Sequence, residues 1–265
     1  MSRTYVIIQA RMTSSRLPGK TLMPLGGKPM LQHVIERCGQ MQGIDGICVA
    51  SPVGDEQNPI KEFVATMDGV EFTQGDEHNV LQRTLDAARE IGADTLIRVT
   101  SDCPFFDPDV GTTLLQAYKS SGASYARLAI EDGFPLGFDL EVFPTELLQI
   151  AVDEGADEYE KEHATPFIWR RPERFPAIWM GHKPDHRDWR LVVDEPKDYE
   201  MAQTAFEELN KINPNFRYKD LVELFARRPD ILAINSDVKQ TPYVPLDNIA
   251  SDWSKDQADA NRKNI

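Results

Sequence analysis

Hydrophobic residues follow two different spacings along the first half of the chain. Runs rich in β-branched residues at 4–10 and 95–100 are typical of strands buried in a parallel sheet. Between such runs, apolar residues recur three or four positions apart, which predicts helices with one buried face. The other strands predicted here are 47–50 and 69–73, and the helices are one that opens at Pro29, then 58–67, 78–91 and 108–120.

This order of elements defines the expected fold class. Four alternations of strand and helix imply right-handed crossovers and a mostly parallel sheet, so we predict an α/β protein with a single doubly wound sheet. In such sheets, ligands bind beyond the carboxyl ends of the strands. Two polar segments fall at such ends, namely the loop that follows 4–10 and the segment 101–104.

The second half of the chain has a less regular pattern. From about Ser236 the chain is polar and patternless, and prolines interrupt it. We therefore expect one folded domain over residues 1–235 and a C-terminal tail over 236–265. The strands predicted in this half are 124–129, 140–143 and 189–193, and the helices are 145–154, 160–170, 196–210 and 219–228.

Charge narrows the range of partners. Lys and Arg total 29 against 43 Asp and Glu, which gives a net charge of −14. This excess of acid argues against nucleic acid polymers and membrane surfaces as partners, because phosphate groups repel a negative field. The first 40 residues differ, since they hold six cations and one acid, Glu36. A basic segment on an acidic protein predicts a local site for a small anion.

Cysteine content and hydropathy bear on the compartment. The three cysteines cannot all pair and form no CxxC motif, which favours a reducing environment. The opening apolar run at 5–8 is too short for a signal peptide, and no apolar stretch approaches the ~20 residues of a membrane helix. We expect a cytoplasmic protein without a membrane partner.

The loop after the first predicted strand carries the cations Arg11, Arg16 and Lys20, with Ser14 between them. Cations and backbone or hydroxyl donors in a loop of this kind suit phosphate oxygens. A phosphate-binding P-loop is a poor match, because Ser14 stands where that motif requires glycine and Pro18 removes an N–H group. The alternative is a surface loop with solvated cations, which does not explain why no acid precedes Glu36.

Two aspartates follow predicted strands. Asp102 comes after 95–100, and Asp194 comes after 189–193. Mg²⁺ prefers one or two carboxylates together with substrate phosphates, so the pair suggests a site for a metal and a nucleoside triphosphate. The alternative is that these residues cap helices, a role for which Asp107 is a better candidate than Asp102.

Six segments in order resemble one family. They are IIQARMTSSRLPGKTLMPLGGKPMLQHVIER (7–37), GDEHNVLQRTLDAA (75–88), RVTSDCPFFDPDV (98–110), FPLGFDLEVF (134–143), EKEHATPFIWRRPE (160–173) and WRLVVDEPKDYE (189–200). They resemble the cytidylyltransferases that activate acidic sugars, the acylneuraminate and 3-deoxy-manno-octulosonate enzymes, and most closely their SpsF-like branch. The resemblance spans about residues 4–205.

The resemblance implies a fold, a co-substrate and site residues. The fold is a single nucleotidyltransferase domain of the nucleotide-diphospho-sugar transferase type with a mixed sheet, usually as a homodimer. CTP and Mg²⁺ are implied. In this sequence Arg11 and Lys20 match the triphosphate-binding cations, and Arg16 and Ser14 belong to the same loop. Backbone atoms of Ala10 would read the cytosine, Arg83 and Thr100 would line the nucleotide pocket, and Asp102 and Asp194 match the metal-binding aspartates.

The acceptor is less defined, because residues 12–16 follow the SpsF-like variant, whose substrates are diverse. Asp139 and Glu141 alternate along a predicted strand, so both would face one way. Glu162 and His163 lie in a nearby predicted helix. Carboxylates and imidazole can bind sugar hydroxyls or a cationic group, whereas acids at a helix start are also favoured by the helix dipole.

These observations give a functional hypothesis. Arg11, Lys20 and Asp102 would catalyse transfer of CMP from CTP to an acidic sugar, or to a related phosphate or carboxylate acceptor, with release of pyrophosphate in surface polysaccharide or glycan synthesis. One alternative is another nucleoside triphosphate used on a sugar phosphate, although such enzymes favour a glycine-rich loop. The other is a nucleotide-binding homologue without turnover, which would not need both Asp102 and Asp194.

Overall fold

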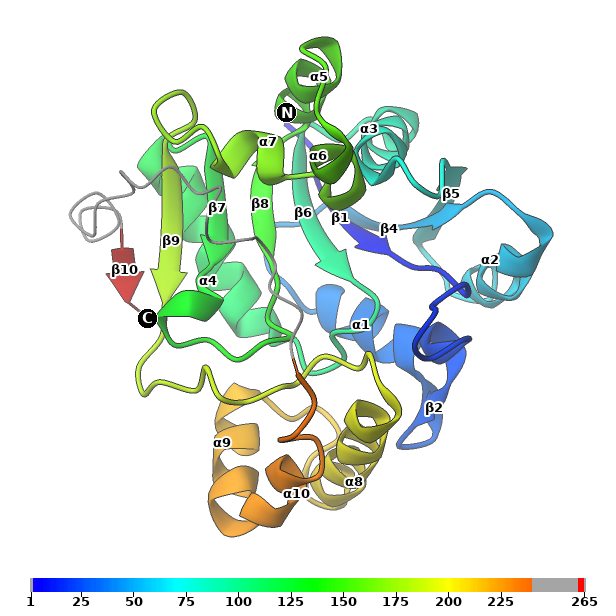
Figure 1. The fold of residues 1–265 in the computed structure, drawn as a ribbon, viewed down its shortest axis with the longest axis vertical. Coiled ribbons are helices and arrows are strands. Elements are labelled where there is room, and N and C mark those ends of the chain that lie inside the picture. The colour runs from blue at the N-terminus through cyan, green and yellow to red at the C-terminus, as the bar shows by residue number, and fades with distance from the viewer. Residues whose placement is uncertain (1, 240–261, 265) are drawn as a thin grey trace.

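A mixed β-sheet runs through the centre of the protein in the computed structural model, which describes residues 2–239 and 262–264 (Figure 1). The strand order is β10-β9-β7-β8-β6-β1-β4-β5. The strands are β1 (Thr4–Gln9), β4 (Gly46–Pro52), β5 (Val70–Gly75), β6 (Thr95–Thr100), β7 (Tyr125–Leu128), β8 (Glu141–Pro144), β9 (Ala177–Gly181) and β10 (Arg262–Asn264), and β2 (Pro24–Leu25) and β3 (Lys28–Pro29) form a separate hairpin.

Helices connect the strands, as the alternating pattern predicts. The short 3-10 turns η1 (Lys20–Leu22), η2 (Asp55–Gln57) and η3 (Ile130–Asp132) lie between longer elements. The α-helices are α1 (Met30–Cys38), α2 (Asn58–Val64), α3 (Val80–Ile91), α4 (Pro108–Ser121), α5 (Thr145–Asp153), α6 (Glu158–His163), α7 (Pro166–Trp169), α8 (Pro196–Ile212), α9 (Tyr218–Arg227) and α10 (Pro229–Ala233).

The sheet is mostly parallel. β1 pairs in parallel with β4 on one side and β6 on the other, and β4 continues in parallel to β5. β8 is the exception, because it runs antiparallel to both β6 and β7. The predicted class, a doubly wound α/β fold with a mostly parallel mixed sheet, is confirmed. The loops after β1 and β6 therefore leave the same edge of the sheet side by side.

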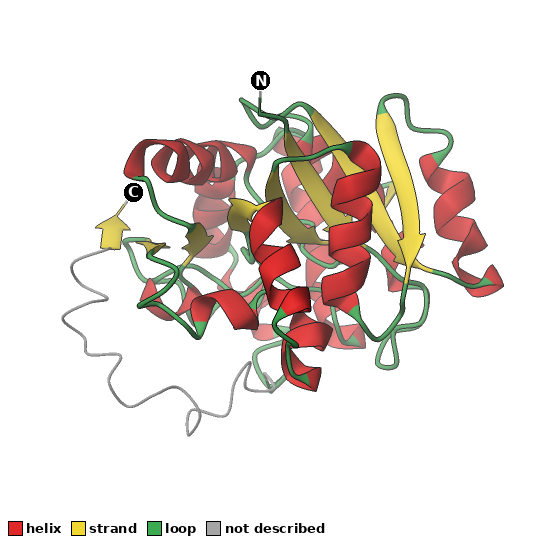
Figure 2. Cartoon of the chain, turned by 90° about the horizontal axis from the view of Figure 1, so that it is seen from above, coloured by secondary structure: helices red, strands yellow, loops and turns green. Residues whose placement is uncertain are grey.

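Helices cover both faces of the sheet (Figure 2). Alternate residues of β1 enter different cores: Val6 and Ile8 face one side, and Tyr5 and Ile7 face the other. The first core includes apolar residues of α1, α2, α4, α8 and α9, and the second includes those of α3, α5 and α7. A strand buried on both faces must be apolar throughout, which explains the continuous hydrophobic run of β1.

Several expectations for the second half are wrong. Residues 189–193 form no strand, because their backbone bonds to separate segments: Leu191 N donates to Leu136 O at 2.8 Å and Val193 N donates to Asp102 O at 2.8 Å. The predicted helix 160–170 is divided between α6 and α7, since Ala164 has a φ of 68° and Pro166 opens α7. β9 and α10 were not predicted at all.

The predicted tail is described only in part. Residues 240–261 and 265 lie outside the described residues, whereas 262–264 form β10, which pairs in parallel with β9. The expected division at 235 and 236 stays a prediction. None of the helices in the described residues is long and apolar enough to cross a membrane.

Candidate nucleotide and metal site

Three segments that are distant in sequence meet at the carboxyl edge of the sheet. They are the loop after β1, the turn after β6 and the segment before α8. Ser101 N donates to Gln9 O at 3.0 Å, which joins the first two, and the bond from Val193 N to Asp102 O joins the last two. The residues singled out in the sequence therefore lie together at the sheet edge beyond which ligands bind in doubly wound folds.

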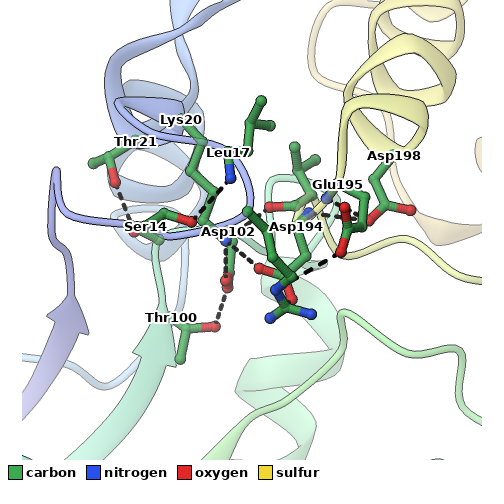
Figure 3. Close-up of polar contacts among 12 residues, drawn as sticks. Ser14, Leu17, Lys20, Thr21, Thr100, Asp102, Asp194, Glu195 and Asp198 are labelled. Carbon is green, nitrogen blue, oxygen red and sulfur yellow. Dashed lines mark hydrogen bonds and ion pairs between the residues drawn. The ribbon is translucent and has the colours of Figure 1, made fainter. Parts of the chain in front are cut away.

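Lys20 lies at the centre of this meeting point, as Figure 3 shows. Its ammonium Nζ donates to Asp102 Oδ2 at 2.7 Å and to Asp194 Oδ1 at 2.8 Å. A third bond, of 2.9 Å, goes to the carbonyl oxygen of Val193. One cation thus holds two carboxylates from different segments toward a common point.

The charges at this point stabilise one another. Burial by itself would lower the pKa of Lys20, but the charges of Asp102 and Asp194 outweigh it, so the pKa is raised. Burial would likewise raise the pKa of Asp102, and Lys20 together with the Thr100 hydroxyl reverses that effect and lowers it. Thr100 Oγ1 donates to Asp102 Oδ1 at 2.6 Å. Asp102 is therefore held ionised.

The shape of the loop directs Lys20 inward. Gly19 has a φ of 73°, in the left-handed region where a side chain would be strained. Its N–H donates to Met12 O at 3.0 Å, and the hydroxyl of Thr21 donates to Arg11 O at 2.8 Å. These bonds close the loop into the turn η1, whose first residue is Lys20. The GKT sequence thus serves a tight turn in this chain, in a loop that is not a P-loop.

Arg16 joins the same cluster from the solvent side. Its guanidinium pairs with Asp194 and approaches Glu195, with 3.8 Å between Arg16 Nε and Glu195 Oε1. The Arg16 side chain is 47% exposed, so solvent screens its pairs with these acids. Ser14 is buried in the same loop, and its Oγ accepts a bond from Leu17 N at 3.4 Å.

A second group of cations lies toward β5. The buried Arg83 guanidinium donates to the carbonyl oxygens of Asp76 and Glu77 at 2.5 Å and 3.1 Å. Burial lowers its pKa to about 10, and the positive charges of Arg11 and Arg98 add to this shift. An anion bound between guanidinium groups reduces the electrostatic repulsion between them, so this group of cations suits an anionic ligand. Ala10, buried at the end of β1, lies in the same loop as Arg11.

The two aspartates suit a divalent cation. Their carboxylate oxygens reach a common point from opposite segments, and oxygen is the ligand that Mg²⁺ prefers. The described part of the chain contains no group of three or more His, Cys, Asp or Glu side chains that could hold a metal. A Mg²⁺ ion held by Asp102 and Asp194 would therefore complete its coordination with substrate phosphates and water.

The structure excludes the alternative that these aspartates cap helices. Asp107 caps α4, since its carboxylate accepts bonds from Asp109 N and Val110 N. The residue that caps α8 is Glu195 rather than Asp194. Asp102 and Asp194 are thus both left to hold Lys20, with side chains that are 24% and 17% exposed.

The predicted acceptor residues do not form one face of a strand. β8 begins at Glu141, and Asp139 lies in the loop before it, so the expectation that they alternate along a strand is wrong. Glu141 is buried: it accepts bonds from Arg98 at 2.6 Å, from the Tyr125 hydroxyl at 2.5 Å and from the Thr165 hydroxyl at 2.7 Å. Its carboxylate is occupied by protein donors.

The other acceptor candidates differ in burial. Asp139 accepts a bond from Gly137 N at 3.3 Å, and burial raises its pKa to about 6, with the charge of Asp102 adding to the shift. Glu162 is exposed. His163 is half-buried at the end of α6, and burial lowers its pKa.

Residues behind the site were missed from the sequence. Asp198 accepts bonds from the backbone N–H groups of Asp194 and Glu195, and Gln57 Oε1 accepts one from Met12 N at 2.8 Å. The signal for Asp198 was present, because an acid at the third position of a helix is one half of a capping box. No local pattern marks Gln57, which contacts a residue 45 positions away.

A mixed, doubly wound sheet with cations and two acids at its carboxyl edge is typical of nucleotidyltransferases, and the similarity to known proteins shows the family. The family model for cytidylyltransferases matches residues 5–244, so the chain belongs to the cytidylyltransferase family, whose members are enzymes. The resemblance seen in the six sequence segments is thereby confirmed.

Individual relatives agree with this assignment. The chain is 29% identical to the spore coat polysaccharide biosynthesis protein SpsF of Bacillus subtilis over 237 residues, 87% of this chain and 97% of that protein. It is 34% identical to 3-deoxy-manno-octulosonate cytidylyltransferase of Escherichia coli over 124 residues, 46% of this chain and 49% of that enzyme. The structure of a cytidylyltransferase from Leptospira borgpetersenii superposes with a TM-score of 0.82 at 26% identity, covering 91% of this chain and all of that one.

Proposed function

We propose that the protein transfers CMP from CTP to an acidic sugar, or to a related phosphate or carboxylate acceptor, and releases pyrophosphate. The observation that carries the proposal is the position of Lys20 between Asp102 and Asp194 at the carboxyl edge of the sheet. Membership of the cytidylyltransferase family supports CTP as the nucleotide. Similarity to SpsF and to a 3-deoxy-manno-octulosonate enzyme supports a sugar acceptor in polysaccharide synthesis.

The reaction is a substitution at phosphorus. An acceptor oxygen forms a bond to the α-phosphorus of CTP, and the bond from that phosphorus to the bridging oxygen of the β-phosphate breaks in line. An ionised carboxylate or phosphate acceptor brings no proton and needs no general base, whereas a sugar hydroxyl that attacks releases its proton to solvent. The work of the protein is therefore to position two anions and to neutralise their charge.

The residues of the site divide this work. Arg11 and Arg83 form the cationic group near β5, which suits the triphosphate or its nucleoside end. Lys20 and the half-exposed Arg16 would neutralise the charge that builds up on the leaving pyrophosphate. Backbone atoms of Ala10 and the side chain of Thr100 would complete the nucleotide pocket. Mg²⁺, held by Asp102 and Asp194, would supply charge neutralisation on the phosphate oxygens.

Pyrophosphate release tests the proposal. The purified protein is incubated with Mg²⁺ and either CTP or UTP, over a panel of acidic sugars, sugar phosphates and neutral sugars. We expect release with CTP and at least one acidic or phosphorylated acceptor, and little release with UTP. Preferred use of UTP would overturn the choice of nucleotide, and CTP binding without turnover on any acceptor would overturn the proposed transfer.

A further inference from the structure

A buried polar network lies directly behind Asp194. Asp198 has no exposed surface, and the Arg190 guanidinium grips its carboxylate with two bonds of 2.8 Å, from Nε to Oδ1 and from Nη2 to Oδ2. The amide Nδ2 of the buried Asn235 donates to Asp198 Oδ1 and to Arg190 O, both at 2.9 Å. The network therefore joins three segments of the chain around one carboxylate.

The same carboxylate fixes the backbone of the proposed metal ligand. Asp198 Oδ2 accepts bonds from Asp194 N at 3.1 Å and from Glu195 N at 2.9 Å (Figure 3). The Glu195 side chain completes a capping box at the start of α8. Asp194 is thus bonded from behind by Asp198 and faces Lys20 in front.

The path of the chain depends on these bonds. Residues 189–193 belong to no strand, and a single bridge holds their first part, in which Leu136 N donates to Trp189 O at 3.1 Å and Leu191 N donates to Leu136 O at 2.8 Å. Their carboxyl end is fixed at Val193, which bonds to Asp102, and then at Asp194 and Glu195, which bond to Asp198. A ligand for a metal must be held to within a fraction of an ångström, which calls for bonded support outside the ligands themselves.

We infer that Asp198, held in place by Arg190 and Asn235, is a positioning residue that sets Asp194 for the divalent cation. The inference rests on the proposed function, since it takes Asp194 as a metal ligand. Asp198 touches neither nucleotide nor metal in this arrangement. It acts through the backbone of Asp194, and its own charge is balanced by Arg190, so the support stays rigid when a ligand binds.

A purely structural role makes a different prediction, and Asp107 provides the matched control. Asp107 is also buried, also caps a long helix, and also accepts backbone bonds, from Asp109 N, Val110 N and Tyr218 N. It supports no residue of the proposed site directly. If capping were the whole role of Asp198, the variants Asp198→Asn and Asp107→Asn would both lower stability, and both would keep the wild-type affinity for the metal.

The test measures the affinity for Mn²⁺ by electron paramagnetic resonance in the presence of saturating CTP, with thermal unfolding recorded for each variant. We expect Asp198→Asn to weaken Mn²⁺ binding by about tenfold or more, the usual effect of losing a residue that supports a metal ligand. Asp107→Asn should keep the wild-type affinity for Mn²⁺, whatever its midpoint of unfolding. In activity assays, Asp198→Asn should lower kcat at saturating CTP more than it raises the KM for CTP.

Milder variants keep the inference testable if Asp198→Asn does not fold. Asn235→Ala removes two hydrogen bonds of the network. Arg190→Lys keeps the positive charge but cannot form the two parallel hydrogen bonds to the carboxylate of Asp198. Both should weaken Mn²⁺ binding in the same direction by a smaller factor. Wild-type affinity in all folded variants of the network would overturn the inference.

The variant Asp194→Asn separates this inference from the proposed function. If Asp194→Asn weakens Mn²⁺ binding and Asp198→Asn does not, only the positioning role is wrong. If Asp194→Asn leaves Mn²⁺ binding unchanged, the metal site itself is wrong.

Discussion

Two clusters of paired charge lie along β6, one beyond its carboxyl end and one within it, and they differ in what surrounds them. In the first, Lys20 pairs with Asp102 and Asp194 beyond the carboxyl end of β6. In the second, Arg98 within β6 pairs with Glu141 at the start of β8, where the two residues face each other in the antiparallel register. Both clusters contain carboxylates that the sequence marks as functional.

The difference lies in access and in spare bonding capacity. The carboxylates of the first cluster keep 24% and 17% of their side-chain surface exposed, whereas Arg98 and Glu141 are each 7% exposed. Hydroxyl groups of Tyr125 and Thr165 take up the remaining capacity of Glu141. Removing one partner of a pair that its own chain encloses destabilises the fold, whereas the pair beyond the strand end is accessible from the edge where ligands bind in such sheets.

The largest expected effect is the loss of activity in Asp102→Ala. Removal of this carboxylate takes away one of the two proposed metal ligands, so we expect pyrophosphate release to fall by about 1000-fold or more. The fold should survive, because Asp102 lies beyond the end of β6. Circular dichroism and the rate with CTP, Mg²⁺ and the best acceptor are the measurements.

The control for Asp102→Ala is Asp185→Ala, which removes an exposed aspartate paired with Arg187. It should retain the wild-type rate. Full Mg²⁺-dependent turnover in Asp102→Ala would show that the first cluster is not part of the active site. The two clusters would then not differ in function.

The second effect concerns stability. Glu141→Ala leaves Arg98 buried without its carboxylate, and losing one partner of a buried pair costs about 3–5 kcal/mol. We expect the free energy of unfolding in urea to fall by that amount, while the affinity for Mn²⁺ with CTP stays near that of the wild type. Glu154→Ala, which breaks an exposed pair with Arg174, should change the stability little.

Glu141→Ala also tests the acceptor role expected from the sequence. Unchanged stability together with a raised KM for the acceptor would assign Glu141 to substrate binding after all. The second cluster would then be a binding element rather than a support of the fold.

The first half of the chain could be predicted because its information is local. Each strand–helix unit of a parallel sheet repeats the same pattern, so β1, β4, β5 and β6 fall within one or two residues of the expected ranges. The rule for strand ends then brings Lys20 and Asp102 together without knowledge of any long-range contact.

The second half could not be predicted in the same way. The apolar run at 189–193 predicts that these residues are buried. It does not predict that their backbone bonds to Leu136 and Asp102, because both partners are distant in sequence. Arg98 and Glu141 meet only because β8 reverses direction beside β6. Asp198 and Asn235 are 37 positions apart. Contacts of this kind depend on the finished topology.

Asp139 gives a smaller effect that depends on pH. Burial raises its pKa to about 6, with Asp102 and Glu141 adding to the shift, against about 3.9 for an unfolded aspartate. The folded state therefore binds this proton more tightly, so its contribution to stability is complete below about pH 4 and is lost as the pH rises to about 6. Asp139→Asn has no carboxylate to ionise, so the variant does not lose this contribution to stability as the pH rises.

We expect Asp139→Asn to be more stable than the wild type by about 1–3 kcal/mol near pH 7.5, with the difference closing near pH 4. Urea unfolding followed by tryptophan fluorescence at both pH values measures it. A difference that is the same at pH 4 and pH 7.5 would show that the carboxyl of Asp139 does not titrate in this range, and that it is screened from Asp102.

The last prediction is that Lys20→Met changes the affinities for Mn²⁺ and for CTP in opposite directions. Lys20 places a positive charge at the point where the carboxylates of Asp102 and Asp194 converge, so it competes with any divalent cation that enters without nucleotide. The methionine keeps the length of the side chain and removes the charge. We expect Mn²⁺ alone to bind about tenfold more tightly to this variant, and CTP to bind about tenfold more weakly.

Arg98→Met is the matched variant in the enclosed cluster. It removes an equally buried cation, and it should lower stability without making Glu141 a site for Mn²⁺, because the carboxylate stays enclosed by Tyr125 and Thr165. Equal gains in Mn²⁺ affinity in both variants would show that access does not distinguish the clusters. If Lys20→Met binds CTP and Mn²⁺ as the wild type does, the ammonium of Lys20 lies outside the ligand site. A cation that contacts the triphosphate or repels the metal cannot be removed without a change in the affinity for CTP or for Mn²⁺.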